Sequence, residues 1–167
     1  LEFELSISER VIYYSASITQ NGNLTQDIAT MKALEILLEW VKNNSDIEND
    51  INTYTIYHQW MGAFPARRNQ ADELLAYANF TGLLTNANKI ILKTRDEALG
   101  VPSIEANSDA VIAAKYARDK FMLNNLEITS DNIKEETYFL VDEVKKLYSL
   151  IHLENFKNKL ENIVQAI

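Results

Sequence analysis

Residues 53–65 read Thr-Tyr-Thr-Ile-Tyr-His-Gln-Trp-Met-Gly-Ala-Phe-Pro, and this stretch is the most informative part of the chain. Its first part, 53–57, is β-branched and aromatic, which predicts a strand. Its second part, 58–65, is dense in aromatic and polar groups, and a helical pattern begins a few residues later. A strand, such a loop and then a helix are typical of a parallel α/β fold, which presents its site at the carboxyl ends of the strands.

The same pattern occurs three times along the chain. Strands are expected at 10–17, 52–58 and 89–93, and the helices that follow them at 25–43, 70–84 and 104–121. Gly22, Gly62 and Gly100 each fall between a strand and its helix, as do both prolines, Pro65 and Pro102. The alternation predicts parallel strands joined by right-handed helical crossovers, with these loops on the face that is the active-site face of a (β/α) barrel.

The rest of the chain is expected to be helical. Helical patterns cover 131–150, which Ser130 or Asp131 can cap, and 155–167. The apolar stripe expected for the first of these helices consists of Phe139, Leu140, Val144, Leu147 and Ile151. Residues 1–125 are therefore predicted to form a partial barrel segment, and residues 126–167 a C-terminal helical segment of the same domain.

The predicted sheet has only three strands, because no fourth strand follows. A three-stranded parallel sheet leaves two edges unpaired and much apolar surface open, which is a poor solution for a free-standing domain. The fold class predicted is α/β, with about three βα units that form part of a (β/α)8 TIM-type barrel, followed by C-terminal helices. The chain is expected to be a piece of something longer.

Composition excludes several classes of function. The chain has 167 residues, of which 47 % are hydrophobic, so one domain with a real core is possible. A net charge of −8 argues against nucleic acid and anionic membranes as partners. The absence of cysteine excludes disulfides, thiolate metal sites and thiol nucleophiles. No apolar run approaches the roughly 20 residues that span a bilayer, and the chain is expected to be soluble and cytoplasmic.

Several loop residues could carry chemistry. Lys93 ends the third expected strand and Glu97 lies four residues on, so this pair could hydrogen-bond a ribose or could be an ion pair that orders the loop; Lys93 as a Schiff base is a third possibility. His58 could act as a general base or be a buried histidine satisfied by the backbone. Trp60 and Phe64 could stack on a planar ligand or plug the barrel mouth. The sequence contains no G-x-G-x-x-G, P-loop, H-E-x-x-H or nucleophile-elbow motif.

Three loops together carry a resemblance to a known family. His-Gln-Trp-Met-Gly-Ala-Phe-Pro at 58–65, Lys-Thr-Arg-Asp-Glu-Ala-Leu-Gly-Val-Pro at 93–102 and Glu-Ala-Asn at 105–107 resemble, in order and spacing, the large (epsilon) chain of glutamate mutase, also called methylaspartate mutase. Gly-Asn-Leu-Thr-Gln-Asp-Ile-Ala at 22–29 is similar to the loop that precedes these in the family. The resemblance runs from about residue 11 to 121, and more weakly through the C-terminal helices.

The resemblance implies a fold and an activity. The family's large chain is a (β/α)8 barrel that sits on a small cobalamin-binding subunit, with the corrin of adenosylcobalamin between them. The enzyme is an isomerase that interconverts (S)-glutamate and (2S,3S)-3-methylaspartate through a 5′-deoxyadenosyl radical, which takes a hydrogen atom from the substrate. The present chain would cover about strands five to seven of that barrel and the helices that follow them. Alone, it is expected to be inactive.

The resemblance also assigns residues. Those that match the cavity for the adenosyl group are Met61, Lys93 and Glu97, and the cofactor-binding set expected from the same loops is completed by His58, Trp60 and Gly62. Lys93 and Glu97 offer a donor and an acceptor for ribose hydroxyls, and Met61 offers a soft apolar surface for adenine. The catalytic residues stay unknown, because the arginines that clamp the amino-acid substrate belong to earlier strands of the family and lie outside this chain.

The chain departs from the family pattern at several positions. Ala63 replaces a usual glycine, residues 66–69 replace an acidic segment, Ile104 replaces a common lysine, and 15–20 lack family glycines. Two alternatives therefore stay open beside an active glutamate mutase. One is a non-catalytic homologue that docks the cobalamin-binding subunit, and the other is a related mutase for another amino acid.

Overall fold

The computed structural model describes residues 1–45, 48, 50–124 and 130–151. Its elements follow one another in the order α1 (Glu2–Ser8), β1 (Tyr13–Thr19), α2 (Leu24–Asn43), β2 (Asn52–His58), α3 (Arg68–Leu84), β3 (Lys89–Ile91), the short 3-10 helix η1 (Arg95–Leu99), α4 (Ile104–Asn124) and α5 (Asp131–Ile151). The helix predicted at 155–167 lies outside the described residues, and so does the chain between α4 and the residue before α5.

The three strands form one parallel sheet in the order β1-β2-β3. In register, Thr19 lies opposite His58, and His58 opposite Ile91, so all three strands end at one edge. The predicted α/β fold with parallel strands is confirmed. The predicted start of the first strand is wrong, because 10–12 belong to a turn in which Arg10 adopts a φ of 56° and Val11 donates its N–H to the Ser6 carbonyl. That turn ends α1, a helix that the sequence pattern did not predict.

The two faces of the sheet differ. Ala16, Thr55 and Tyr57 are buried on the face that the helices cover. On the other face Tyr13 and Tyr54 are 68 % and 41 % exposed, with their ring centroids 6.5 Å apart. Successive side chains of a strand point to opposite faces, so this alternation identifies one packed and one open face. None of the described helices covers the open face.

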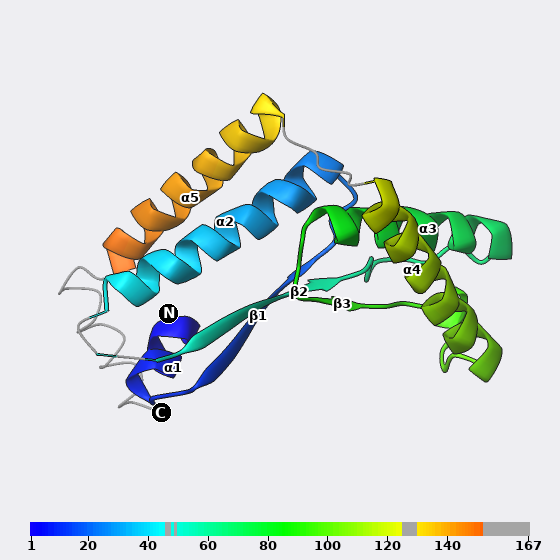
Figure 1. Cartoon of the computed structure of the whole chain (residues 1–167), viewed down its shortest axis with the longest axis horizontal. Coiled ribbons are helices and arrows are strands. Elements are labelled where there is room, and N and C mark those ends of the chain that lie inside the picture. The colour runs from blue at the N-terminus through cyan, green and yellow to red at the C-terminus, as the bar shows by residue number, and fades with distance from the viewer. Residues whose placement is uncertain (46–47, 49, 125–129, 152–167) are drawn as a thin grey trace.

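The helix α2 is the centre of the packed layer. Asn23 caps it by accepting a hydrogen bond from the Gln26 N–H, as asparagine does at this position. One core cluster joins it to α1 and the amino ends of the strands, through Phe3, Ile7, Ala16, Leu38 and Ile51. A second joins it to α5 through Ile28, Ala29 and Ile133. Figure 1 shows α2 and α5 side by side over their whole length.

The helix α5 turns a different side to α2 than its apolar stripe predicted. Its buried residues are Ile133, Thr137 and Val141, which follow one another at the four-residue spacing of one helix face. The predicted residues Phe139, Val144 and Leu147 are exposed, and Leu140 is partly buried. Apolar residues span a wide arc of α5, and the position of α2 decides which part of that arc is covered. The predicted capping by Ser130 is confirmed, since its hydroxyl oxygen accepts from the Ile133 N–H.

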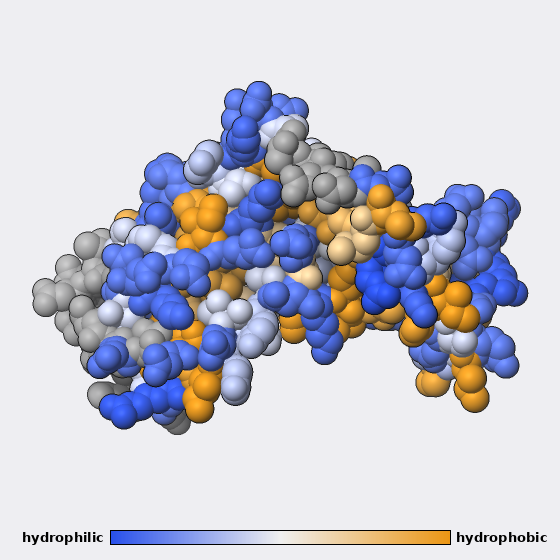
Figure 2. Space-filling model, in the orientation of Figure 1, coloured by the Kyte–Doolittle hydropathy of each residue, from blue (hydrophilic) through white to orange (hydrophobic). Residues whose placement is uncertain are grey.

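The helices α3 and α4 cover the other end of the sheet. Gly82 lets α3 approach closely, because an added Cβ would lie 3.0 Å from both the Tyr57 and the Ile90 side chains. In α4 only Ala106 is buried. Figure 2 shows hydrophobic surface where α4 lies. The large apolar and aromatic side chains of α4 that are exposed include Ile104, Val111, Ile112, Tyr116, Met122 and Leu123. Among the described residues, no helix combines the length and hydrophobicity needed to cross a membrane.

Candidate functional site at the carboxyl edge of the sheet

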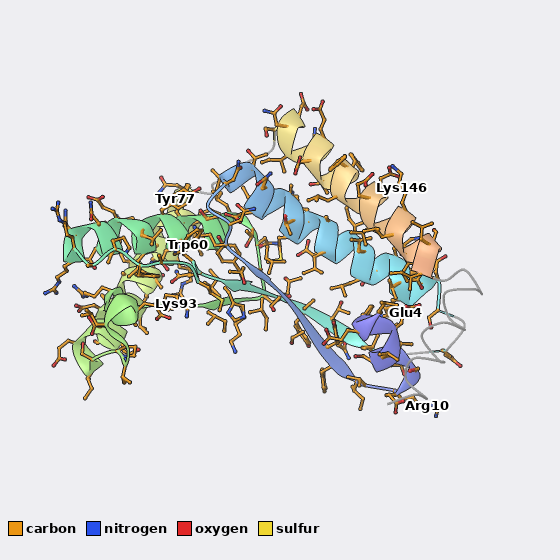
Figure 3. The ribbon with its side chains drawn as sticks, turned by 180° about the vertical axis from the view of Figure 1, so that it is seen from behind. Glu4, Arg10, Trp60, Tyr77, Lys93 and Lys146 are labelled. Atoms are coloured by element: carbon orange, nitrogen blue, oxygen red, sulfur yellow. The ribbon has the colours of Figure 1, made fainter. Side chains whose placement is uncertain are left out.

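The loops that leave the three strands meet at the carboxyl edge of the sheet. Figure 3 shows Trp60, Tyr77 and Lys93 at this end of the molecule and Glu4 and Arg10 at the other. Tyr77 of α3 donates its hydroxyl hydrogen to the Gly22 carbonyl over 3.4 Å, so the first loop also touches the second helix. We call the segments 20–23, 59–67 and 92–103 the loop edge.

Lys93 and Glu97 form the ion pair that the four-residue spacing predicted. Lys93 Nζ lies 2.6 Å from Glu97 Oε1, and the two side chains are 19 % and 32 % exposed. The 3-10 helix η1 brings them together, because it begins right after Lys93 and Thr94 and carries Glu97 in its first turn. A partly exposed pair of this kind adds little stability. It does leave donor and acceptor positions free of backbone partners, which suits binding of a polar ligand.

The other residues of this motif hold the loop in place. Arg95 is 14 % exposed and pairs with Asp72 of α3 at 3.6 Å and with Asp109 of α4. Asp96 accepts hydrogen bonds from the backbone and the hydroxyl of Ser103, at 2.9 and 2.6 Å, and these bonds hold the pKa of its carboxyl below the usual value of 3.8. Ser103 in turn caps α4, since its Oγ accepts from the Ala106 N–H. The loop is thus fastened at Arg95 and Asp96, between the two members of the Lys93–Glu97 pair, and again at the start of α4.

Trp60 packs against its own loop. Its indole N–H donates to the Ala63 carbonyl at 3.1 Å, and a Cβ on Gly62 would come within 2.6 Å of the ring. A Cβ on Gly22 of the first loop would lie 3.6 Å from the same ring. These contacts are compatible with plugging the barrel mouth, and stacking of Trp60 on a planar ligand stays a prediction. Gly62 is required because no side chain fits beneath the indole.

Met61 and His58 complete the predicted set. Met61 is 56 % exposed, and its sulfur accepts a hydrogen bond from the Thr19 hydroxyl at 3.7 Å. His58 is half-buried and ends β2, in register between Thr19 and Ile91. This partial burial is compatible with both predicted roles of His58, a general base or a histidine satisfied by the backbone. Met61 is therefore accessible to a ligand at the loop edge, and His58 stands at its base.

Two buried glutamines join the loops, and the sequence motifs did not single them out. Gln20 and Gln59 are 3 % and 1 % exposed, and each follows the last residue of a strand. Gln20 Oε1 accepts from the Trp60 N–H at 3.0 Å, and Gln59 Oε1 accepts from the Lys93 N–H at 2.8 Å. The available signal was their position, since Gln59 comes directly after the predicted strand at 52–58 and Gln20 lies three residues past the end of the predicted strand at 10–17.

A buried carboxylate orders the first loop. Asp27, at the start of α2, is 1 % exposed and accepts from the Asn21 N–H at 2.8 Å. Burial raises the pKa of this carboxyl, and the backbone hydrogen bonds of Asn21 and Gly22 partly oppose the shift. Nearby Tyr57 has its pKa raised by burial and, to a lesser degree, by the charge of Asp27. The sequence pattern did not identify Asp27, because an acidic residue in a first helical turn usually faces solvent.

The described residues offer polar and apolar groups for an organic ligand rather than ligands for a metal. No group of three or more histidine, aspartate or glutamate side chains in the described ranges is placed to hold a metal ion. The partly exposed polar pair Lys93–Glu97 and the exposed side chain of Met61 stand on neighbouring loops. Such an arrangement fits a ligand with hydroxyl groups beside an apolar ring.

Comparison with known proteins identifies the family. The family model described as methylaspartate mutase E chain matches residues 1–158. This chain belongs to the methylaspartate mutase E chain family. Several relatives are named glutamate mutase epsilon subunit. The one from Treponema denticola is 34 % identical over 137 residues, which cover 75 % of this chain and 27 % of the relative.

Other relatives cover more of the chain. The Haloarcula marismortui epsilon subunit is 26 % identical over 166 residues, 99 % of this chain and 33 % of the relative. The epsilon subunit of Desulfitobacterium hafniense is 30 % identical over 154 residues, which cover 88 % of this chain and 31 % of the relative. The chain thus spans about a third of the length of these relatives. The predicted family resemblance is confirmed.

Proposed function

We propose that this chain is part of the large subunit of an adenosylcobalamin-dependent glutamate mutase, an isomerase that interconverts (S)-glutamate and (2S,3S)-3-methylaspartate. The observation that carries the proposal is the partly exposed Lys93–Glu97 pair at the loop edge of a chain in this family. Relatives that carry the name glutamate mutase epsilon subunit support the reaction class. The 167 residues alone are proposed to be inactive, because the groups that would clamp the substrate would belong to the rest of the longer protein.

The loop edge fits the adenosyl group of the cofactor. The ammonium of Lys93 and the carboxylate of Glu97 present a donor and an acceptor, which match the two hydroxyls of a ribose. Met61, which is 56 % exposed, offers a polarisable surface for adenine. We propose that these three side chains contact the adenosyl group, and that Trp60, Gly62 and His58 shape the loop around it. When bound, adenosylcobalamin supplies radical chemistry that no protein side chain here provides.

The same proposal accounts for the open face of the sheet. Tyr13 and Tyr54 are exposed there, as residues that line the interior of a (β/α)8 barrel would be when the other strands are absent. The barrel would be completed by further strands of the longer protein, with residues 1–125 as barrel and 126–167 as helices of the same domain. A small cobalamin-binding subunit would then cover the loop edge, and the amino-acid substrate would bind inside the barrel.

In this arrangement the protein's own residues would bind, orient and shield the adenosyl group of the cofactor. Lys93 and Glu97 would fix the ribose, and the packed indole of Trp60 would keep water from the mouth of the barrel. The Arg95 contacts to Asp72 and Asp109 hold the loop to two helices, so the pair keeps its place when the ligand is absent. A site prepared in advance loses less free energy on binding.

The test is Lys93→Met in the natural gene product that carries this chain, mixed with the cobalamin-binding subunit, adenosylcobalamin and L-glutamate. Removing the charge takes away a ribose partner, so the cofactor should bind about tenfold more weakly, the size of a lost hydrogen bond to a charged group. Lys115→Met on the exposed surface of α4 is the matched control and should bind normally. Formation of 3-methylaspartate and retention of cofactor by ultrafiltration are measured together.

The outcomes separate the alternatives. Turnover that depends on the partner and the cofactor, and that falls in Lys93→Met, supports the proposal. No turnover by the unmutated protein in a complex with the partner would favour the non-catalytic docking homologue. Turnover of another amino acid in place of glutamate would favour the related mutase. Unchanged cofactor binding in Lys93→Met would remove the assigned role of Lys93.

A further inference from the structure

The two buried glutamines repeat one arrangement. The Gln20 backbone N–H donates to the His58 carbonyl at 2.9 Å, and Gln20 Oε1 accepts from the Trp60 N–H at 3.0 Å. Gln59 does the same one strand further on, with the Ile91 carbonyl at 3.2 Å and the Lys93 N–H at 2.8 Å. In each case a side-chain amide extends the parallel ladder past the end of the strand. Each glutamine therefore fixes the loop that leaves the next strand.

The Gln59 side chain is anchored on its other side as well. Its Nε2 donates to Asn79 Oδ1 of α3 at 2.8 Å, and Asn79 is itself 5 % exposed. A buried amide with both ends bonded is held in one orientation, because turning it would leave polar groups without partners. Helix α3 is thus connected through Gln59 to the backbone of Lys93.

The contact matters for Lys93 because nothing in the strand ladder holds that residue. The strand β3 ends at Ile91, and Lys93 lies between this strand and η1. Its backbone is held by Gln59, while its side chain reaches Glu97. The packing around Gln59 leaves space, since a cavity of about 220 Å³ borders Gln59, Asn79 and Lys93. An unbranched side chain of similar length can therefore replace Gln59 without a clash.

We propose that Gln59 is a positioning residue for the Lys93–Glu97 pair. Its hydrogen bonds to Asn79 and to the Lys93 N–H fix the position of this pair before a ligand binds. This inference rests on the proposed function of the pair in holding the adenosyl group. Gln20 holds Trp60, and with it the loop of Met61, in the corresponding way. The two glutamines therefore serve different loops by the same contact.

The first experiment follows amide hydrogen exchange in the natural gene product without cofactor. Gln59→Met removes the acceptor of the Lys93 N–H and keeps the length of the side chain, so exchange in 92–97 should rise roughly tenfold, as expected for the loss of about one hydrogen bond. Exchange in α3 should stay unchanged. The matched control Gln20→Met should raise exchange in 60–64 instead and leave 92–97 alone.

The second experiment measures the binding of adenosylcobalamin, with the partner subunit present, to Gln59→Met, Lys93→Met and the double variant. If Gln59 acts through Lys93, Gln59→Met should weaken binding about tenfold alone and by less than about twofold when Lys93 is already methionine. KM for the amino acid should change less than KM for the cofactor. The smaller effect of Gln59→Met on cofactor binding when Lys93 is already methionine is a readout that a purely structural glutamine would not give.

The results separate this inference from the proposed function. Additive losses in the double variant, or increased exchange throughout α3, would make Gln59 a general packing residue and overturn the inference. Normal cofactor binding by Gln59→Met together with weak binding by Lys93→Met would overturn the inference and leave the proposed function intact. Normal binding by Lys93→Met would overturn both. Local exchange in 92–97 with non-additive binding supports the inference.

Discussion

Two helices of nearly equal length behave differently in this molecule. The 20-residue α2 and the 21-residue α4 each follow a strand and a loop of the same βα pattern. Helix α2 buries Asp27, Ile28, Ala29, Met31, Ala33 and Leu38, whereas α4 buries only Ala106. The difference lies in their neighbours, because α2 is enclosed by the sheet and α5, while α4 contacts α3 and η1.

This comparison shows that the burial of the helix in a βα unit depends on which elements pack against its outer face. The apolar residues of α2 meet α1 and α5, both of which are within the described chain. Those of α4 stay exposed, including Ile112 at 62 % and Met122 at 72 %. Large exposed apolar stretches mark interaction surfaces, so α4 is where the longer protein would add its next contacts under the barrel proposal.

The largest effect is expected for Ile28→Ala in α2. Ile28 is 1 % exposed and packs against Ala29 and Ile133, so truncation should lower the free energy of unfolding by about 2 to 5 kcal/mol. Ile36→Ala, on the same helix but 41 % exposed, is the matched control and should cost less than about 1 kcal/mol. Urea unfolding followed by circular dichroism measures both, and equal losses would contradict the enclosure of α2.

A smaller, pH-dependent effect is expected for Asp27→Asn, also in α2. Burial raises the pKa of Asp27 above its usual value of 3.8, so folding favours its protonated form. Its contribution to stability is present below pH 3.8 and is lost as the pH rises through the raised pKa. The variant should therefore gain stability relative to the unmutated protein as the pH rises from acidic to neutral.

Urea unfolding at several pH values measures this difference. Asparagine keeps an oxygen that can accept from the Asn21 N–H, so the loop after β1 should remain in place. A constant difference between the two proteins from acidic to neutral pH would mean that the Asp27 carboxyl titrates equally in the folded and unfolded states. Burial of the Asp27 carboxyl in the first turn of α2 would then carry no electrostatic cost.

The smallest effect is expected for Ile112→Ala in α4, the same change as Ile28→Ala at an exposed site. In the 167-residue chain the free energy of unfolding should change by no more than about 0.5 kcal/mol, because the side chain is 62 % exposed. In the natural gene product the loss should exceed about 1 kcal/mol if further chain covers α4. A small change in both proteins would count against the barrel proposal at this helix.

Much of the fold could be predicted from local patterns. The strand at 52–58 was predicted with the bounds that β2 has, and the helices α2 and α3 begin within two residues of their predicted starts. The errors lie where a neighbour decides the outcome. Helix α1 carries no long apolar pattern and is held by Phe3 and Ile7 against the sheet and α2. The covered side of α5 depends on α2, which its own periodicity does not reveal.

The candidate site could be predicted in part. The spacing of Lys93 and Glu97 suggested that they pair, and they do, at 2.6 Å. The roles of Arg95 and Gln59 were not predicted, because their partners lie on α3 and α4 or on a loop far along the chain. The role of Asp96 was not predicted either, although its partner Ser103 lies only seven residues further on. The role of these site residues in holding a cofactor stays a prediction.

From β1 onward the order of strands and long helices, the parallel sheet and the family follow from the sequence alone, because periodicity, loop residues and motif spacing are properties of neighbours along the chain. Only the tertiary structure decided that Gln20 and Gln59 bridge successive loops, that Trp60 lies over Gly62, and that α2 is enclosed while α4 is not. Each of these depends on which groups of distant segments come within contact, and burial then makes every unpaired polar atom costly and every filled space favourable.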